Sequence, residues 1–206
     1  MKKHSLARPF QILTGVILGL AGVFWILRPG SGEPEVDPRQ YFLSDPLPAP
    51  SFTLTSHRGE PVSTSDFPDR IIAVFFGYTF CPDICPLTLS HLSLAFQELG
   101  EEATRIQLLF ISVDPGRDTP ERLGQYLGAF HPSFLGLTGS EEGIREVANA
   151  FGAFFARSGE GDDYTVDHTA RTFVIDPSGR IPLTFPVTAT PEEMARDFAL
   201  LLREFE

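Results

Sequence analysis

Residues 71–86 read IIAVFFGYTFCPDICP, and this stretch decides the fold and holds both cysteines of the 206-residue chain. Residues 71–77 form a continuous apolar run with β-branched and aromatic side chains, which predicts a strand buried on both faces. Pro86 suits the first turn of a helix that continues to Leu99. A buried strand leading into a helix is typical of open α/β folds, where functional sites lie at such junctions.

The flanking sequence continues this alternation of strands and helices. Upstream, residues 52–55 and 61–64 flank the turn residues 57–60 and predict a hairpin. Downstream we expect strands at 106–113, 134–137, 172–175 and 181–185, and helices from Pro120, over 141–155 and over 191–205. The pattern predicts an α/β layer fold, with a central mixed sheet flanked by helices, over residues 51–206.

The N-terminal part predicts a membrane anchor. Residues 10–27, FQILTGVILGLAGVFWIL, carry no charge and reach the minimum length for a transmembrane helix. The first acidic residue is Glu33, whereas four basic residues flank the apolar run: Lys2, Lys3, Arg8 and Arg28. By the positive-inside rule, residues 1–9 are cytoplasmic. A cleaved signal peptide is the alternative, but no A-x-A-like site follows Leu27.

The expected location follows from this topology. Residues 28–50 hold six prolines and predict a Pro-rich linker between the anchor and the folded domain. Bacterial and mitochondrial inner membranes both fit a single-pass anchor, but the short basic start lacks a Ser/Arg-rich presequence. We therefore expect a bacterial inner-membrane protein whose domain faces the periplasm.

Composition excludes several classes of protein. The net charge is −11, and the chain without its four N-terminal basic residues carries about −15. Such an acidic domain would not release counterions from a nucleic acid, so nucleic-acid binding is not expected. Two cysteines are too few for a disulfide-stapled scaffold.

The two cysteines themselves predict a site. Cys81 and Cys85 are four residues apart, which would place both sulfurs on one face of a helical turn. A helix N-terminus also favours thiolate over thiol. Soft-metal ligation, dithiol–disulfide exchange, or both fit such a pair. Two inert buried cysteines are the alternative, which the strand–helix junction disfavours.

A metal site would need a third ligand, and four histidines follow the apolar segment. His57 lies in the expected hairpin turn, His91 is on the helix but faces elsewhere, and His131 is in a loop. His168 lies just before the strand expected at 172–175. In thioredoxin-like architecture the loop before that strand faces the cysteine pair, so His168 is the candidate.

Two departures from redox motifs favour metal binding over disulfide exchange. Thioredoxin-like oxidoreductases carry a cis-proline before that strand, whereas residues 167–171, DHTAR, contain no proline. The cysteine spacing is CxxxC rather than the redox spacing CxxC. Two thiolates and an imidazole suit Cu(I) and can hold Cu(II). A structural zinc site would need a fourth ligand, which is harder to find.

Several motifs resemble those of the Sco/SenC family of copper chaperones. The resemblance covers nearly the whole chain and includes GYTFCPDICP (77–86), SVDPGRDTPE (112–121), GLTG (136–139), VDHTA (166–170) and VIDPSGRI (174–181). It implies a thioredoxin-like fold with Cys81, Cys85 and His168 as copper ligands. It also implies delivery of copper to subunit II of cytochrome c oxidase. Asp114 matches an acidic position often near the metal, and Tyr78 and Asp83 are further candidates beside the ligands.

Two functions follow as hypotheses. A copper chaperone would transfer copper by ligand exchange and need not be an enzyme. Oxidation of Cys81 and Cys85 to a redox-active disulfide would abolish binding, so a thiol reductant is an expected partner, along with another periplasmic copper chaperone. The alternative is a membrane-tethered thiol–disulfide reductase that keeps the acceptor's copper-ligand cysteines reduced.

Overall fold

Three parallel strands form the centre of an eight-stranded mixed sheet: β4 (Ile71–Gly77), β5 (Ile106–Ser112) and β6 (Leu135–Thr138). The structure is a computed structural model, and it describes residues 37, 39–159, 161 and 163–205. All residues of β4 and β5 are buried, as parallel strands covered on both faces require. The sequence-based prediction of these three strands is confirmed.

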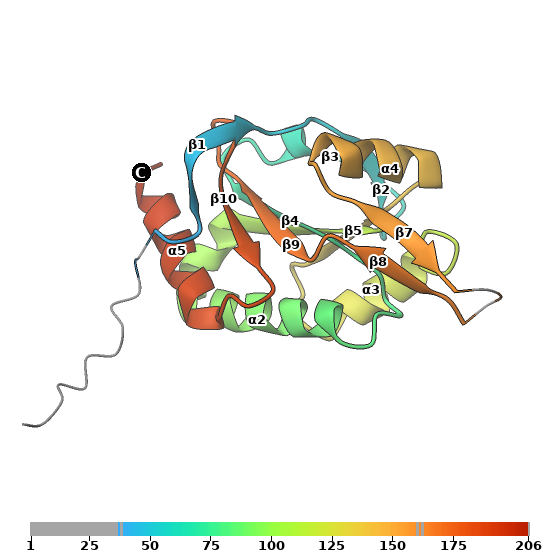
Figure 1. Ribbon diagram of the computed structural model, residues 1–206. Helices are drawn as coiled ribbons and strands as arrows, with labels where there is room; N and C mark the ends of the chain where they lie inside the picture. The colour runs from blue at the N-terminus through green and yellow to red at the C-terminus, as the bar shows by residue number, and fades with distance from the viewer. Residues whose placement is uncertain (1–36, 38, 160, 162, 206) are drawn as a thin grey trace, which may run out of the picture. The chain divides into compact units, whose positions relative to one another are not determined.

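Helices connect these parallel strands and cover the sheet. α2 (Ile84–Leu99) joins β4 to β5, and α3 (Pro120–Gly128) joins β5 to β6. Both lie with α5 (Pro191–Arg203) on one face, while α4 (Glu141–Ala150) covers the other (Figure 1). Parallel neighbours require such crossover helices, and two right-handed crossovers in the same direction place α2 and α3 on the same face.

The remaining strands of the sheet are antiparallel to their neighbours. Its order is β1-β10-β9-β4-β5-β6-β2-β3. The outer strands are β1 (Phe42–Pro48), β2 (Thr53–Ser56), β3 (Pro61–Ser63), β9 (Arg171–Ile175) and β10 (Arg180–Pro186). Short 3₁₀ turns, η1 (Thr64–Asp66) and η2 (Gly100–Arg105), complete this set. The expected mixed sheet flanked by helices is confirmed, as is the β2–β3 hairpin, and the strands expected at 172–175 and 181–185 pair as the β9–β10 hairpin.

A second, two-stranded sheet was not predicted. The helix expected over 141–155 ends at Ala150, and Gly152 takes a positive φ of 67°. The chain then forms β7 (Phe155–Ser158), which pairs antiparallel with β8 (Thr165–His168). Figure 1 shows this β7–β8 hairpin projecting from one end of the sheet. The end of the predicted helix was therefore wrong.

The linker expected over 28–50 was also wrong at its C-terminal end. Residues 42–48 form β1, which pairs with β10 at the edge of the sheet, so the domain begins before residue 51. Pro46 and Pro48 are compatible with an edge strand, because the missing N–H can face away from the neighbouring strand. The predicted segments 1–9 and 10–27 lie outside the described residues. Among the residues that are described, no helix has the length and apolarity needed to cross a membrane.

Candidate metal centre

Cys81, Cys85 and His168 converge at one end of the sheet. Their ligand atoms all lie within 4.8 Å of one another, and Cys85 Sγ is 3.5 Å from His168 Nε2. The other histidines tested by the sequence argument bond elsewhere: His57 to Gly136, His91 to Ala189 and His131 to Ser133. The structure therefore brings together the three residues that the sequence singled out.

The two cysteines differ in their backbone setting. Cys85 is fully buried in the first turn of α2, whereas Cys81 is half-buried in the preceding loop. The expectation that both lie on one helical turn was wrong, because α2 begins only at Ile84. The loop nevertheless directs Cys81 inward, and its Sγ accepts a hydrogen bond from the Cys85 N–H at 3.4 Å.

Gly77, the last residue of β4, makes room for the buried thiol. A Cβ atom at this position would lie 2.8 Å from Phe110 Cε2 and 2.9 Å from Cys85 Sγ. Both distances are too short for real atoms, so only glycine lets the strand end this close to the helix. The glycine thus sets the depth at which Cys85 lies.

The two thiols differ in acidity. A hydrogen bond from the Cys85 thiol lowers the pKa of Cys81, and His168 and backbone N–H groups at Asp83 and Cys85 add to this effect, while burial opposes it. The same hydrogen bond, with burial and the Cys81 charge, raises the pKa of Cys85. The shared hydrogen bond therefore favours a thiolate at Cys81 and a proton on Cys85.

His168 is oriented by its neighbours. It is the last residue of β8, and its ring meets the rings of Phe75 and Tyr78 edge-on at centroid distances of 6.1 and 5.9 Å. Its Nδ1 lies 3.3 Å from the Thr169 carbonyl oxygen. In the neutral tautomer whose Nδ1–H donates to this carbonyl, Nε2 carries the lone pair and faces Cys85, which is the arrangement of a metal-binding histidine.

The three other candidates have different surroundings. Tyr78 is buried against His168, and its hydroxyl accepts a hydrogen bond from the Val166 backbone N–H. Asp83 is exposed, and its backbone N–H rather than its carboxylate faces Cys81. Asp114 is buried and accepts hydrogen bonds from Tyr164 Oη (2.6 Å) and Arg117 Nε (2.5 Å). Only Tyr78 thus contacts a ligand through its own side chain.

Asp118 is a site residue that the sequence reasoning missed. It is buried, and its carboxylate accepts hydrogen bonds from Thr79 N (3.0 Å), Thr79 Oγ1 (2.6 Å) and Ser112 Oγ (2.7 Å). These bonds hold the loop between β4 and α2 that carries Cys81. The available signal was its place in the SVDPGRDTPE motif, two residues before the helix expected from Pro120.

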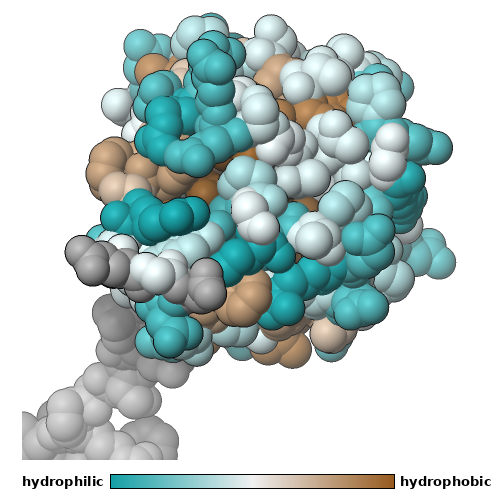
Figure 2. Space-filling model, turned by 90° about the vertical axis from the view of Figure 1, so that its right-hand side faces the viewer, coloured by the Kyte–Doolittle hydropathy of each residue, from teal (hydrophilic) through white to brown (hydrophobic). Residues whose placement is uncertain are grey.

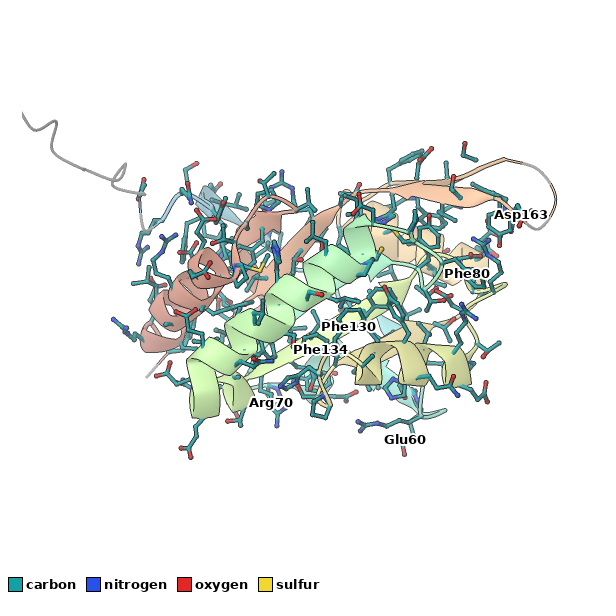
Figure 3. The ribbon with its side chains drawn as sticks, turned by 90° about the horizontal axis from the view of Figure 1, so that it is seen from below. Glu60, Arg70, Phe80, Phe130, Phe134 and Asp163 are labelled. Carbon is teal, nitrogen blue, oxygen red and sulfur yellow. The ribbon has the colours of Figure 1, made fainter. Side chains whose placement is uncertain are left out.

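The cluster is accessible from one side. A groove of about 310 Å³ opens beside it and is lined by Tyr78, Cys81, Pro82, Asp83, Ile84, Thr165, Val166, Asp167, His168 and Ala170. Figure 3 shows Phe80 beyond the N-terminal end of α2, with Asp163 further out on the hairpin. Figure 2 views the hairpin end, where apolar areas lie among mostly hydrophilic residues. The groove reaches Cys81 and His168, whereas the buried Cys85 does not line it.

The donor set fits a soft metal ion. An ion about 2.0–2.3 Å from each of three donors separates them by about 3.5–4 Å. The Cys85–His168 distance of 3.5 Å and the 4.8 Å limit for the cluster agree with this geometry to within a small adjustment. Thiolate and imidazole are the ligands preferred by copper among the softer metals.

A thioredoxin-like α/β fold with this donor set defines a class of soft-metal-binding proteins, and the sequence profile of the SCO1/SenC family matches residues 44–203. The chain belongs to that family. SCO2-like protein RC0895 of Rickettsia conorii is 32% identical over 198 residues, which are 94% of this chain and 97% of that protein.

Two solved structures extend the comparison. Bradyrhizobium japonicum ScoI with copper bound is 36% identical, with a TM-score of 0.70, and the match covers 76% of this chain and 100% of that one. BsSco, described with a disulfide switch and as a member of the Sco family of cytochrome c oxidase assembly proteins, is 25% identical, with a TM-score of 0.62. That match covers 78% of this chain and 98% of BsSco.

Proposed function

We propose that the protein is a membrane-anchored copper chaperone that delivers copper to subunit II of cytochrome c oxidase. Cys81, Cys85 and His168 bind the copper ion, and their convergence within 4.8 Å is the observation that carries the proposal. Copper bound to ScoI and the cytochrome c oxidase assembly role of the BsSco family support both the cargo and the acceptor.

Delivery proceeds by ligand exchange through the groove. Cys85 is fully buried, whereas Cys81 and His168 are partly exposed. An incoming ligand of the acceptor therefore replaces Cys81 or His168 first, and Cys85 releases the ion last. Binding displaces the proton of Cys85, and release returns a proton to it.

The redox state of the cysteines controls loading. The two cysteines are not joined by a disulfide in the structure. A disulfide of another molecule can oxidise the pair by thiol–disulfide exchange: the two sulfurs join, and two electrons and the remaining proton pass to the other molecule's sulfurs. This step removes two of the three ligands. A thiol reductant must reverse this step before copper binds again. A second periplasmic copper chaperone is the proposed source of copper.

A thiol–disulfide reductase is the second candidate function. A half-exposed thiolate beside a buried thiol is the arrangement of an attacking and a resolving cysteine. In this function His168 would stabilise the Cys81 thiolate rather than bind a metal. The disulfide switch described for BsSco supports redox chemistry at the pair.

The proposed location is the bacterial inner membrane. The uncharged segment 10–27 and its basic flanks support a single-pass anchor with a cytoplasmic N-terminus and a periplasmic domain. Membrane fractionation followed by protease treatment of spheroplasts tests this topology. Loss of the domain on protease treatment is expected, whereas full protection would contradict the proposal.

Copper titration of the full chain in detergent tests the function. Competition with a Cu(I) chelator compares the wild type with His168→Ala and with His131→Gln as a matched control. We expect His168→Ala to bind copper at least tenfold more weakly and His131→Gln to bind as the wild type does. The chaperone proposal would be contradicted if His168→Ala bound copper as tightly as the wild type and reduced a model disulfide equally well.

A further inference from the structure

Arg117 contacts both segments that supply the ligands. It lies in the loop between β5 and α3, and its side chain is 17% exposed. We infer that Arg117 is a positioning residue, which holds the Cys81 loop and the His168 strand at ligand distance. The inference rests on the proposed copper site and assigns Arg117 no contact with the ion.

The first set of contacts holds the hairpin. Arg117 Cζ lies 3.5 Å from the centroid of the Tyr164 ring, and Nη1 donates a hydrogen bond to the Tyr164 carbonyl oxygen at 3.0 Å. Arg117 Nε and Tyr164 Oη each donate to one oxygen of Asp114, at 2.5 and 2.6 Å. Tyr164 directly precedes β8, which ends at His168. The contacts among Arg117, Tyr164 and Asp114 therefore fix the beginning of the strand that carries the imidazole.

The second set of contacts holds the cysteine loop. Arg117 Cζ lies 4.5 Å from the centroid of the Phe80 ring and 6.0 Å from that of Tyr78. Phe80 directly precedes Cys81 and is also covered by Arg122, whose Cζ is 3.8 Å from its ring centroid. Although 43% exposed, Phe80 thus contacts two guanidinium groups. Its contacts stabilise the loop that carries Cys81.

A guanidinium suits this double role. It is planar, so it stacks on aromatic rings and donates in-plane hydrogen bonds at the same time, whereas a lysine ammonium cannot do both. The neighbouring Asp118 accepts a hydrogen bond from Thr79, which lies in the loop that carries Cys81. The β5–α3 loop therefore contacts both ligand-bearing segments, with Arg117 as the residue that reaches them together.

Such a connection matters because the cysteines follow a strand of one sheet, whereas His168 ends a strand of another. β4 belongs to the large sheet, whereas β8 pairs with β7 in the small one. Ligand positions must hold to within about 0.5 Å for a metal site to keep its geometry. Loss of Arg117 would let the hairpin shift relative to the cysteines without unfolding the domain.

Substitutions at this contact should weaken copper binding in a graded series. Arg117→Gln removes the charge and much of the stacking, and should lower Cu(I) affinity about 10- to 100-fold. Arg117→Lys retains the ion pair with Asp114 and should restore part of that loss. The matched control is Arg157→Gln, because Arg157 Cζ lies 3.7 Å from the same Tyr164 ring but belongs to β7. This control should stay within about threefold of the wild type.

A double-mutant cycle with His168→Ala provides the test. The full chain in detergent is titrated with Cu(I) against a chelator, and the Cu(II)–thiolate absorption band is recorded for each variant. Arg122 and Asp118 still hold the Cys81 loop when Arg117 is replaced, so Arg117→Gln in the His168→Ala background should change affinity less than about threefold. In the otherwise wild-type chain, Arg117→Gln should also shift the Cu(II)–thiolate absorption band.

Each outcome has one meaning. An equal loss of affinity from Arg117→Gln in both backgrounds would overturn the positioning role. If His168→Ala alone binds copper as the wild type does, the proposed copper site fails instead. Should Arg117→Gln not fold, Tyr164→Phe replaces it in the cycle, because it removes the hydroxyl bonded to Asp114 but keeps the ring. A loss for Tyr164→Phe that disappears in the His168→Ala background supports the role, and an unchanged loss contradicts it.

Discussion

The two halves of the metal centre are built differently. β4, which leads to the cysteines, is buried throughout and is paired with β5 and β9. β8, which carries His168, alternates between exposed and buried residues and is paired with β7 in a two-stranded sheet. An isolated two-stranded hairpin is marginally stable. The core therefore fixes the position of the cysteines. The position of His168 depends on the contacts that hold the hairpin to the domain and, in the proposed function, on the ion.

The largest effect is expected in the rigid half. Gly77→Ala would place a methyl group 2.8 Å from Phe110 Cε2 and 2.9 Å from Cys85 Sγ. Such overpacking should lower the free energy of unfolding by about 1–3 kcal/mol and weaken copper binding, because Cys85 must move. Urea denaturation and copper titration measure both. Gly128→Ala is the control, since a Cβ there meets nothing within 4 Å. Unchanged stability in Gly77→Ala would show that the strand end is not rigid.

The next effect concerns protons at the buried thiol. Hydrogen bonding to Cys81 and burial raise the pKa of Cys85, so the ion must displace a proton that Cys85 holds at neutral pH. Release of one proton makes Cu(I) affinity fall about tenfold for each unit that the pH decreases between 8 and 6. Chelator competition at several pH values measures this slope. A flat profile would mean that Cys85 is already a thiolate in the free protein.

A smaller effect is expected in the hairpin half. Thr169 Oγ1 accepts a hydrogen bond from the Phe154 N–H at 2.9 Å, which ties the end of β8 to the start of β7. Thr169→Val should cost about 1 kcal/mol locally, and so speed hydrogen exchange in β7 and β8 about fivefold with little change in global stability. Copper should restore the protection.

Thr165→Val is the matched control for this measurement. Its Oγ1 lies 3.4 Å from the Ser158 carbonyl oxygen, a weak hydrogen bond near the exposed end of the hairpin. Hydrogen exchange close to that of the wild type is expected there. If Thr169→Val instead lowers global stability as much as Gly77→Ala does, the hairpin unfolds with the core, and the contrast between the halves disappears.

The same contrast explains what the sequence could predict. The apolar run of β4 and the position of Pro86 were enough to locate the strand–helix junction. His168 was singled out because of its place before β9, and the structure places it beside the cysteines, although its own strand was missed. β7 and β8 have four residues each, too few for a periodic signal, and the helical pattern before them conceals their start. The contacts of Arg117 with Tyr164 and of Asp118 with Thr79 join residues far apart in the chain, so no local pattern could reveal them.

The smallest effect lies away from both halves. His57 is in the β2–β3 turn, and its Nδ1 accepts a hydrogen bond from the Gly136 N–H at 3.0 Å. Burial lowers the pKa of His57, and the charge of Arg58 adds to this effect. The unfolded chain thus binds the proton more readily, and stability should decrease as the pH falls below about 6.5, the ordinary histidine pKa.

His57→Gln should therefore reduce the pH dependence of stability without changing that of copper binding. Urea denaturation at pH 7 and at pH 5.5 measures this dependence. The loss of unfolding free energy between the two pH values should be smaller in His57→Gln than in the wild type, by less than about 1 kcal/mol. Part of the loss remains in the variant, because burial also lowers the pKa of His131. The pH slope of Cu(I) affinity should stay that of the wild type, since it belongs to Cys85. A change in the pH slope of Cu(I) affinity would show that protonation of His57, rather than of the buried thiol, governs copper loading.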